Sequence, residues 1–186
     1  MDRAILEELR TETLNHVIIN MSPRPVFNHN IVAGNIYNIF STYLESSTCT
    51  AIPDGTEVYL SDKDRFIPDM SVVCNTKIIK RNGVHGAPDF VVEVLSPSTE
   101  KRDKGYKKSA YEAAGVKEYW LVDVDKRTIE VYELVDGRYE LVNLYGVFPT
   151  YSEEEKTPDI KTKFQSLIFP DLTIDLDKVF AKMIAY

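Results

Sequence analysis

The segment that most constrains the fold is Asp89–Leu95 (DFVVEVL), an apolar run interrupted by Glu93. Apolar residues at consecutive positions are typical of a strand that is buried on both faces in the centre of a sheet. Glu93 therefore points into the interior or toward the floor of a cleft. A buried carboxylate costs several kcal/mol unless it is paired, protonated or bound to a metal. Glu93 thus indicates either a structural ion pair or a functional acid, and the strand alone leaves both readings open.

The segments around this strand predict a mixed α/β domain. Helices are expected within residues 1–20, at about 30–45 with Asn30 as the cap, over Thr99–Ala114 up to Gly115, and near the end of Leu167–Ile184. Strands are expected at His16–Asn20, Glu57–Leu60, Asp69–Cys74, Asp89–Leu95, Glu118–Val124, Thr128–Leu134 and Arg138–Tyr145, with an acidic surface loop at 149–162. The order helix, three strands, helix, strands predicts a central mixed sheet with helices on its faces.

Length and charge limit the classes of function. A chain of 186 residues fits one domain, 1–186. The 29 acidic residues exceed the 22 basic ones, and the net charge of -7 argues against a protein that simply coats nucleic acid. Cys49 and Cys74 are too few for a disulfide framework, so we expect a reducing, cytoplasmic location, with Cys74 as a core residue. No signal peptide and no membrane span is expected.

A second acid, Asp69, begins the predicted strand that precedes Glu93. Two acids on neighbouring central strands can meet at one sheet edge, where their oxygens suit Mg²⁺ or Mn²⁺. On its own, Asp69 is equally typical of a turn. Asp89 shares face parity with Glu93, but four residues of strand span roughly 13 Å, so we expect it to hold the loop. The histidines and cysteines have no zinc-site spacing.

Asp103, Lys107 and Tyr111 follow at intervals of four and share one face of the predicted helix. One interpretation is a solvated face with a surface ion pair; the other places Lys107 over the sheet edge near Glu93, with Lys104 and Lys108 facing solvent. The basic cluster on this helix is either a solvated face or a rim that meets phosphates. It comprises Lys101, Arg102, Lys104, Lys107 and Lys108.

Several segments together resemble the Uma-two family of restriction-endonuclease-like proteins, in the PD-(D/E)XK nuclease superfamily. They are MSPRPVFNHN, IPDMSVVC, GAPDFVVEVLSPST and RDKGYKKSAYEAAGVKEYWLVD. The resemblance runs from about Asn20 to Phe169-Pro170-Asp171, and the combination of PDFVVEVLSPST with AGVKEYWLVD is specific. It implies a restriction-endonuclease-like core of helix, three strands, helix and strand, with extra strands and a helix at the C-terminal end.

The resemblance also implies roles for residues. Asp69 matches the first acid of the motif and Glu93 the second, while Leu95 stands where the superfamily lysine is usual. Lys107 matches a lysine that has migrated to the following helix. By the same analogy Asp69, Glu93 and the Val94 carbonyl would bind Mg²⁺ or Mn²⁺.

Supporting residues are implied as well. Asp103 and Tyr111 would fix the Lys107 side chain. The superfamily's early acid has no clear match; Glu45 is one candidate, and His29 is the other residue that could occupy the neighbourhood.

These observations favour a metal-dependent DNA endonuclease, in which cutting of both strands favours a homodimer. The alternative is a catalytically silent domain that keeps the fold to bind a partner. The negative net charge and Leu95 favour this alternative. A structural ion-pair core with an unrelated hydrolase activity is the third reading. We further expect that Glu93→Gln or Asp69→Asn removes activity without unfolding the protein.

Overall fold

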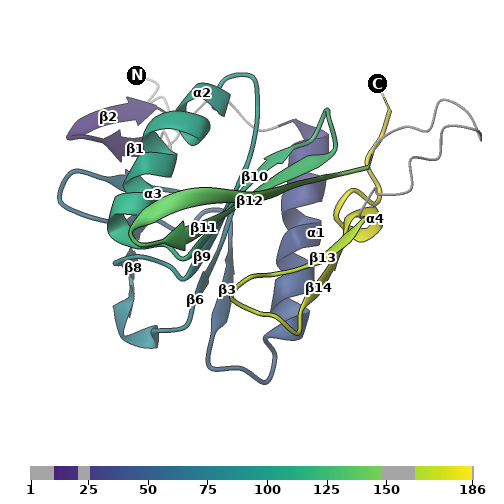
Figure 1. Ribbon diagram of the computed structural model, residues 1–186. Helices are drawn as coiled ribbons and strands as arrows, with labels where there is room; N and C mark the ends of the chain where they lie inside the picture. The colour runs from purple at the N-terminus through teal and green to yellow at the C-terminus, as the bar shows by residue number, and fades with distance from the viewer. Residues whose placement is uncertain (1–10, 21–25, 148–161, 186) are drawn as a thin grey trace, which may run out of the picture.

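The structure is a computed structural model that describes residues 11–20, 26–147 and 162–185 (Figure 1). Within these ranges the chain forms a central sheet, a second sheet beside it and a short hairpin. The helical elements are α1 (Phe27–Tyr43), η1 (Thr76–Ile78), α2 (Glu100–Arg102), η2 (Asp103–Lys107), α3 (Lys108–Ala114) and α4 (Leu176–Val179). None of the helices in the described ranges is long and apolar enough to cross a membrane.

The central sheet has the strand order β12-β11-β10-β9-β6-β3. Its strands are β3 (Thr50–Pro53), β6 (Met70–Val73), β9 (Phe90–Val94), β10 (Glu118–Asp123), β11 (Thr128–Val135) and β12 (Arg138–Gly146). The pair β9–β10 is parallel and the other pairs are antiparallel. Every residue of β9 is buried, as the apolar run around Glu93 predicts. This mixed sheet confirms the predicted fold class.

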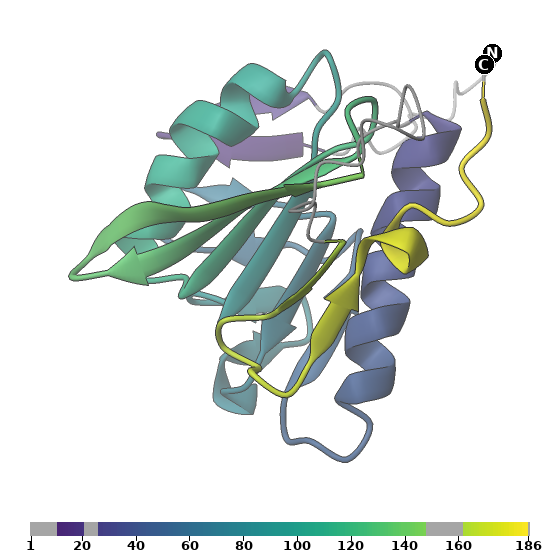
Figure 2. The same ribbon diagram turned by 45° about the vertical axis from the view of Figure 1, so that its right-hand side comes forward.

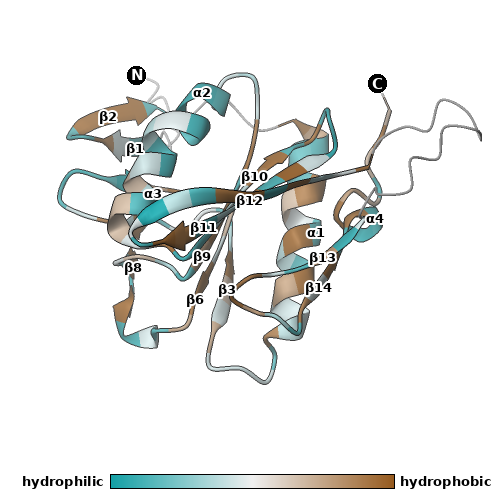
Figure 3. Cartoon of the chain, viewed as in Figure 1, coloured by the Kyte–Doolittle hydropathy of each residue, from teal (hydrophilic) through white to brown (hydrophobic). Residues whose placement is uncertain are grey.

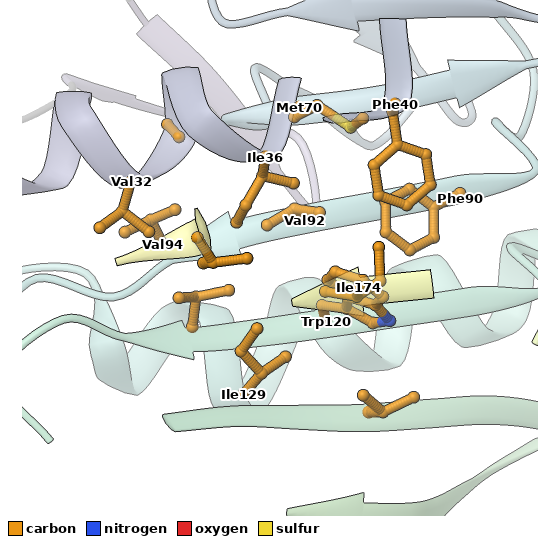
Figure 4. Close-up of a cluster of buried hydrophobic side chains, with 14 of the residues drawn as sticks. Val32, Ile36, Phe40, Met70, Phe90, Val92, Val94, Trp120, Ile129 and Ile174 are labelled. Atoms are coloured by element: carbon orange, nitrogen blue, oxygen red, sulfur yellow. The ribbon is translucent and has the colours of Figure 1, made fainter. Parts of the chain in front are cut away.

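One face of the central sheet is covered by α1 and holds the larger apolar core. Val32, Ile36 and Phe40 recur every four residues along α1 and point onto the even-numbered residues of β9 (Figure 4). The rings of Phe40 and Phe90 stack with centroids 4.6 Å apart. Because every fourth residue lies on the same side of a helix, this spacing buries one stripe of α1.

The C-terminal segments lie on the same face as α1 (Figure 2). They are β13 (Lys163–Gln165), β14 (Thr173–Asp175) and α4, and they contribute Phe164, Ile174 and Leu176 to the core. The sequence predicted a strand-like piece and a closing helix in Leu167–Ile184, which β14 and α4 confirm. It did not predict β13.

The opposite face of the central sheet packs against the helical segment 100–114 and part of the second sheet (Figure 1). Tyr111, Tyr119, Phe66 and Leu14 form this second core. The second sheet has the order β2-β1-β5-β4-β8-β7. Its strands are β1 (Thr11–Leu14), β2 (Val17–Asn20), β4 (Val58–Tyr59), β5 (Arg65–Phe66), β7 (Ile79–Lys80) and β8 (Gly83–His85). Its edge strand β2 is mostly apolar, and its Val17 and Ile18 are exposed (Figure 3).

Several predicted boundaries are wrong. The first long helix begins at Phe27 with Val26 as its cap, and not at Asn30. The side-chain amide of the nearby Asn28 does not cap the helix. It accepts from the Ile184 N–H and donates to the Ile184 carbonyl, both at 2.9 Å. Residues Thr11–Leu14 form a strand paired with β2, so the helix expected before His16 does not extend this far; its earlier part and the loop at 149–161 lie outside the described residues.

The prediction for Cys74 is partly right, because Cys74 is half-buried and packs against the larger core, but its pairing with Cys49 was not predicted. Cys49 and Cys74 form a disulfide. Cys49 precedes β3 and Cys74 follows β6, and since Thr50 pairs with Val73, the two cysteines face each other across the ladder. Their separation of 25 residues hides this contact in the sequence. The bond links the two strands at one end of the β3–β6 pair. The cytoplasmic location stays a prediction.

Candidate active site

Three buried carboxylates surround the ammonium group of Lys107. Its Nζ lies 2.9 Å from Glu12 Oε1, 3.1 Å from Glu93 Oε1 and 3.3 Å from Asp103 Oδ1. The exposed fraction of each of these four residues is 3% or less. Lys107 therefore faces the interior beside Glu93, and the interpretation of a solvated helix face is wrong.

The helix that carries Lys107 changes its hydrogen bonding at this point. Residues Asp103–Lys107 form a π-helical turn between α2 and α3, and Gly115 closes α3 in the left-handed conformation, with φ of 92°. Single π turns inside helices are frequent at functional sites, because the wider turn shifts the side chains that follow it. The hydroxyl of Tyr119, from β10, donates to the Asp103 carbonyl at 3.1 Å and holds the turn on the sheet. The turn thus brings Asp103 and Lys107 to Glu93 together.

Glu93 is the acid on which these contacts converge. The Tyr111 hydroxyl donates to Glu93 Oε1 at 2.8 Å, and the same oxygen meets Lys107. Burial raises the pKa of Glu93 well above its usual value although Lys107 opposes the shift, and the neighbouring acids raise it further. Burial alone would lower the pKa of Lys107, but Glu93, Asp103 and Glu12 outweigh it and raise that pKa. Lys107 is therefore firmly protonated.

Asp69 lies directly before β6 and beside Glu93. Met70 pairs with Val92 in the antiparallel β6–β9 ladder, so the same register continued by one residue brings Asp69 next to Glu93. The Val94 N–H donates to Asp69 Oδ2 at 2.7 Å. The two acids are thus neighbours at one edge of two central strands, where the sequence expected them. Whether they share a cation stays a prediction.

His29 approaches Asp69 from the first turn of α1. Its Nε2 lies 3.4 Å from Asp69 Oδ2. Burial lowers the pKa of His29, yet Asp69 and the backbone of Val94 outweigh this effect, so the pKa lies above its usual value. His29 Nδ1 is buried and makes no hydrogen bond to any of the described residues. His29 therefore belongs to the same cluster as Asp69, on the side of α1.

The other predicted helix residues lie away from the cluster. Lys104 pairs with Glu100 at 3.0 Å and Glu130 at 3.3 Å on the surface. Lys108 is half-buried, with its Nζ 3.6 Å from the centroid of the Tyr132 ring, so the expectation that it faces solvent is only partly right.

Asp89 accepts from the Cys74 N–H at 2.8 Å and pairs with Lys117 at 2.7 Å. It therefore holds the loop, as the sequence predicted.

Glu12 is the site residue that the sequence analysis missed. It lies on β1, with 1% of its surface exposed, and its Oε1 both meets Lys107 and accepts from the Ile67 N–H at 3.1 Å. The sequence pattern that could have identified Glu12 is its spacing of two residues from Leu14, because residues two apart in a strand point to the same side and both are buried here. The alternative candidate, Glu45, is exposed in the turn after α1, roughly 24 Å along the helix from its first residues.

The donor set at this edge fits a hard cation. The contacts of Asp69 with Val94 and His29 fall on Oδ2, and those of Glu93 with Lys107 and Tyr111 fall on Oε1, so Asp69 Oδ1 and Glu93 Oε2 take no part in them. Within the described ranges, no three or more His, Cys, Asp or Glu side chains are arranged to hold a metal ion. A metal here would therefore rest on Asp69, Glu93, the Val94 carbonyl and water, and Mg²⁺ commonly binds proteins through one or two carboxylates while keeping several waters.

The fold is similar to that of a protein of known structure. The chain superposes on a solved protein described as "a putative nuclease belonging to DUF820" from Anabaena variabilis, with a TM-score of 0.71, 19% identity, and coverage of 94% of this chain and 91% of that one. At this identity the likeness shows the fold.

Residues 2–172 match the sequence model of the Uma2 family, described as "Putative restriction endonuclease". The chain belongs to this family. A curated relative, "Uncharacterized protein slr1290" of Synechocystis, is 29% identical over 119 residues. That alignment covers 62% of this chain and 63% of the relative.

Proposed function

We propose that this protein is a metal-dependent DNA endonuclease, in which Asp69, Glu93 and the Val94 carbonyl hold Mg²⁺ or Mn²⁺. The observation that carries the proposal is the buried contact between Lys107 and Glu93, at 3.1 Å. The strand position that would supply the lysine holds Leu95, which packs in the second core. Lys107 brings an ammonium group to Glu93 from the following helix instead.

The charge of the cluster supports a cation. Four carboxylates, Glu12, Asp69, Glu93 and Asp103, are linked by contacts to Lys107 or to the backbone next to Glu93. Buried acids near one another repel, and each loses hydration, so the ionised cluster is costly without a counter-ion. A divalent cation would remove this excess of negative charge.

In the proposed reaction a bound Mg²⁺ would polarise the phosphodiester and stabilise its developing charge. Lys107 stays protonated because of its raised pKa, and its three N–H groups are matched by Glu12, Glu93 and Asp103. It would orient the attacking water as a hydrogen-bond donor, rather than act as a base, by exchanging one of these carboxylate contacts for the water. Asp103 and Glu12 hold the ammonium group from two sides, and Tyr111 holds Glu93 Oε1. His29 orients Asp69.

The decisive experiment is a titration with Mg²⁺ followed through the melting temperature, for the parent and for Glu93→Gln and Asp69→Asn. The parent should gain stability by mass action, about 2.7 kcal/mol at a metal concentration 100 times the dissociation constant. Both variants should lose this gain and DNA cleavage. Without metal they should be at least as stable as the parent, because each removes a charge from the acidic cluster.

Glu118→Gln is the matched control, because Glu118 is also buried in the central sheet but points to the α1 face. Its metal response should equal that of the parent. A parent that is indifferent to Mg²⁺ and Mn²⁺, together with a strongly destabilised Glu93→Gln, would instead support a structural ion pair.

The silent-domain alternative makes a separate prediction. A domain kept only for binding would bind DNA or a partner without cleaving DNA in Mg²⁺ or Mn²⁺.

A homodimer is part of the proposed endonuclease function, because it would present two sites to the two strands of a duplex. Sedimentation of the protein with and without duplex DNA tests this expectation.

A further inference from the structure

A cavity of about 180 Å³ opens beside the Asp69 end of the site, between α1 and the turn that follows β3. One wall is the α1 face formed by His29, Asn30, Ala33, Gly34 and Tyr37; Pro53 and Asp54 form the other, and Asp69 completes the lining. The cavity therefore forms a small chamber next to the candidate metal position. The proposed chemistry does not use this chamber.

The size of the chamber indicates what it can hold. Sites for whole small molecules measure roughly 300–1,000 Å³, so 180 Å³ suits one ring of a larger molecule whose remainder stays outside. A nucleic acid whose phosphodiester lies at the proposed metal position, beside Asp69, is such a molecule.

The chemistry of the lining narrows the choice further. Asp54 and Asp69 make the chamber unfavourable for a phosphate, and favour a neutral group that donates hydrogen bonds. Tyr37 supplies an aromatic ring, and aromatic rings stack on nucleobases. A nucleobase is uncharged, donates hydrogen bonds and has a flat face for stacking, so it meets both conditions.

A base inside a duplex cannot enter such a chamber, because it is stacked and paired; it must be unpaired or flipped out. We propose that the cavity receives one unpaired nucleobase next to the scissile phosphodiester, so that the preferred substrate is DNA with a single-stranded nucleotide at the cut. This inference rests on the proposed nuclease function and names the substrate class of the same site.

Gly34 provides the test. A Cβ at this position would meet no atom within 4 Å, so a larger side chain would occupy the open space of the chamber. Gly34→Leu also replaces glycine by a better helix former and should not lower the melting temperature. Asn38→Leu is the control: it lies one turn further along α1, is exposed, and does not line the cavity.

The rate of cleavage is measured with Mg²⁺ on matched single-stranded, fully paired and singly bulged oligonucleotides. The parent should cut the substrates with unpaired nucleotides faster. Gly34→Leu should lower that rate by about 5-fold to 150-fold, the contribution of stacking one base, and leave the slower cutting of paired DNA unchanged. Asn38→Leu should behave as the parent.

Equal or faster cutting of paired DNA by the parent, or a preference that survives in Gly34→Leu, would overturn the inference while the nuclease function stands. Failure of the parent to cut any of the three substrates would remove the nuclease function, and the inference with it.

Discussion

Two buried glutamates, Glu93 and Glu118, lie on the neighbouring strands β9 and β10 but point to opposite faces of the central sheet. Glu118 accepts hydrogen bonds from Trp120 Nε1, Ser166 Oγ and the N–H groups of Leu167 and Ile168, at 2.7–3.1 Å. Glu93 instead meets the Lys107 ammonium group and the Tyr111 hydroxyl, with two further acids around the same lysine.

The difference distinguishes a structural acid, Glu118, from Glu93, the acid that we propose is functional. Neutral donors fixed by the fold satisfy Glu118, so it ties the C-terminal segment to β10 and is complete without a ligand. Glu93 lies in a cluster whose negative charge exceeds its positive charge, which is the condition under which a cation binds. Burial by itself therefore does not identify a functional acid; the chemistry of its partners does.

The largest effect on stability should come from removing Lys107. Lys107→Met leaves Glu12, Glu93 and Asp103 buried around an apolar side chain, and breaking a buried ionic network in this way costs about 3–5 kcal/mol. Lys104→Met is the control, since its surface pairs with Glu100 and Glu130 contribute about 0–1 kcal/mol. Urea unfolding at pH 7 without metal measures both. Equal losses for the two variants would show that the cluster around Lys107 does not depend on its charge.

Glu118→Gln should have the next largest effect on stability. A glutamine has one acceptor oxygen, so either the Trp120 N–H or the donors from residues 166–168 would face its NH₂ group. An unsatisfied buried donor costs about 1–3 kcal/mol. Glu93→Gln, by contrast, should cost nothing without metal. If the two variants are destabilised equally, the distinction between the two glutamates fails.

The sequence predicted the centre of this fold because its strands are long apolar runs with clear ends. Glu93 within β9, Asp69 before β6 and the spacing of Lys107 follow from such patterns, and so the site's main residues could be named. The helix ending at Gly115 was equally clear.

What the sequence could not supply is pairing between distant segments. Glu12 reaches Lys107 only because β1 folds over the helical segment, and short strands such as β4 and β5 carry too few residues for a periodic pattern. The Cys49–Cys74 bond depends in the same way on the register of β3 against β6. The π turn was not predicted either, because Gly105 at its centre weakens an ordinary helix but does not specify a π turn.

The smallest expected effect is a pH dependence that belongs to Glu118. Burial raises the pKa of Glu118 above its usual value, although its backbone and side-chain donors oppose the shift. Between the unfolded pKa and the raised folded pKa, the folded protein binds more protons than the unfolded chain, so the free energy of unfolding falls as pH rises. Glu118→Gln has no such proton. The stability advantage of the parent over this variant should therefore be largest below about pH 4.5, shrink as pH rises through the folded pKa, and then level off. Subtracting one protein's profile from the other cancels the other titrating groups. A difference that grows with pH would mean that the donors around Glu118 outweigh its burial.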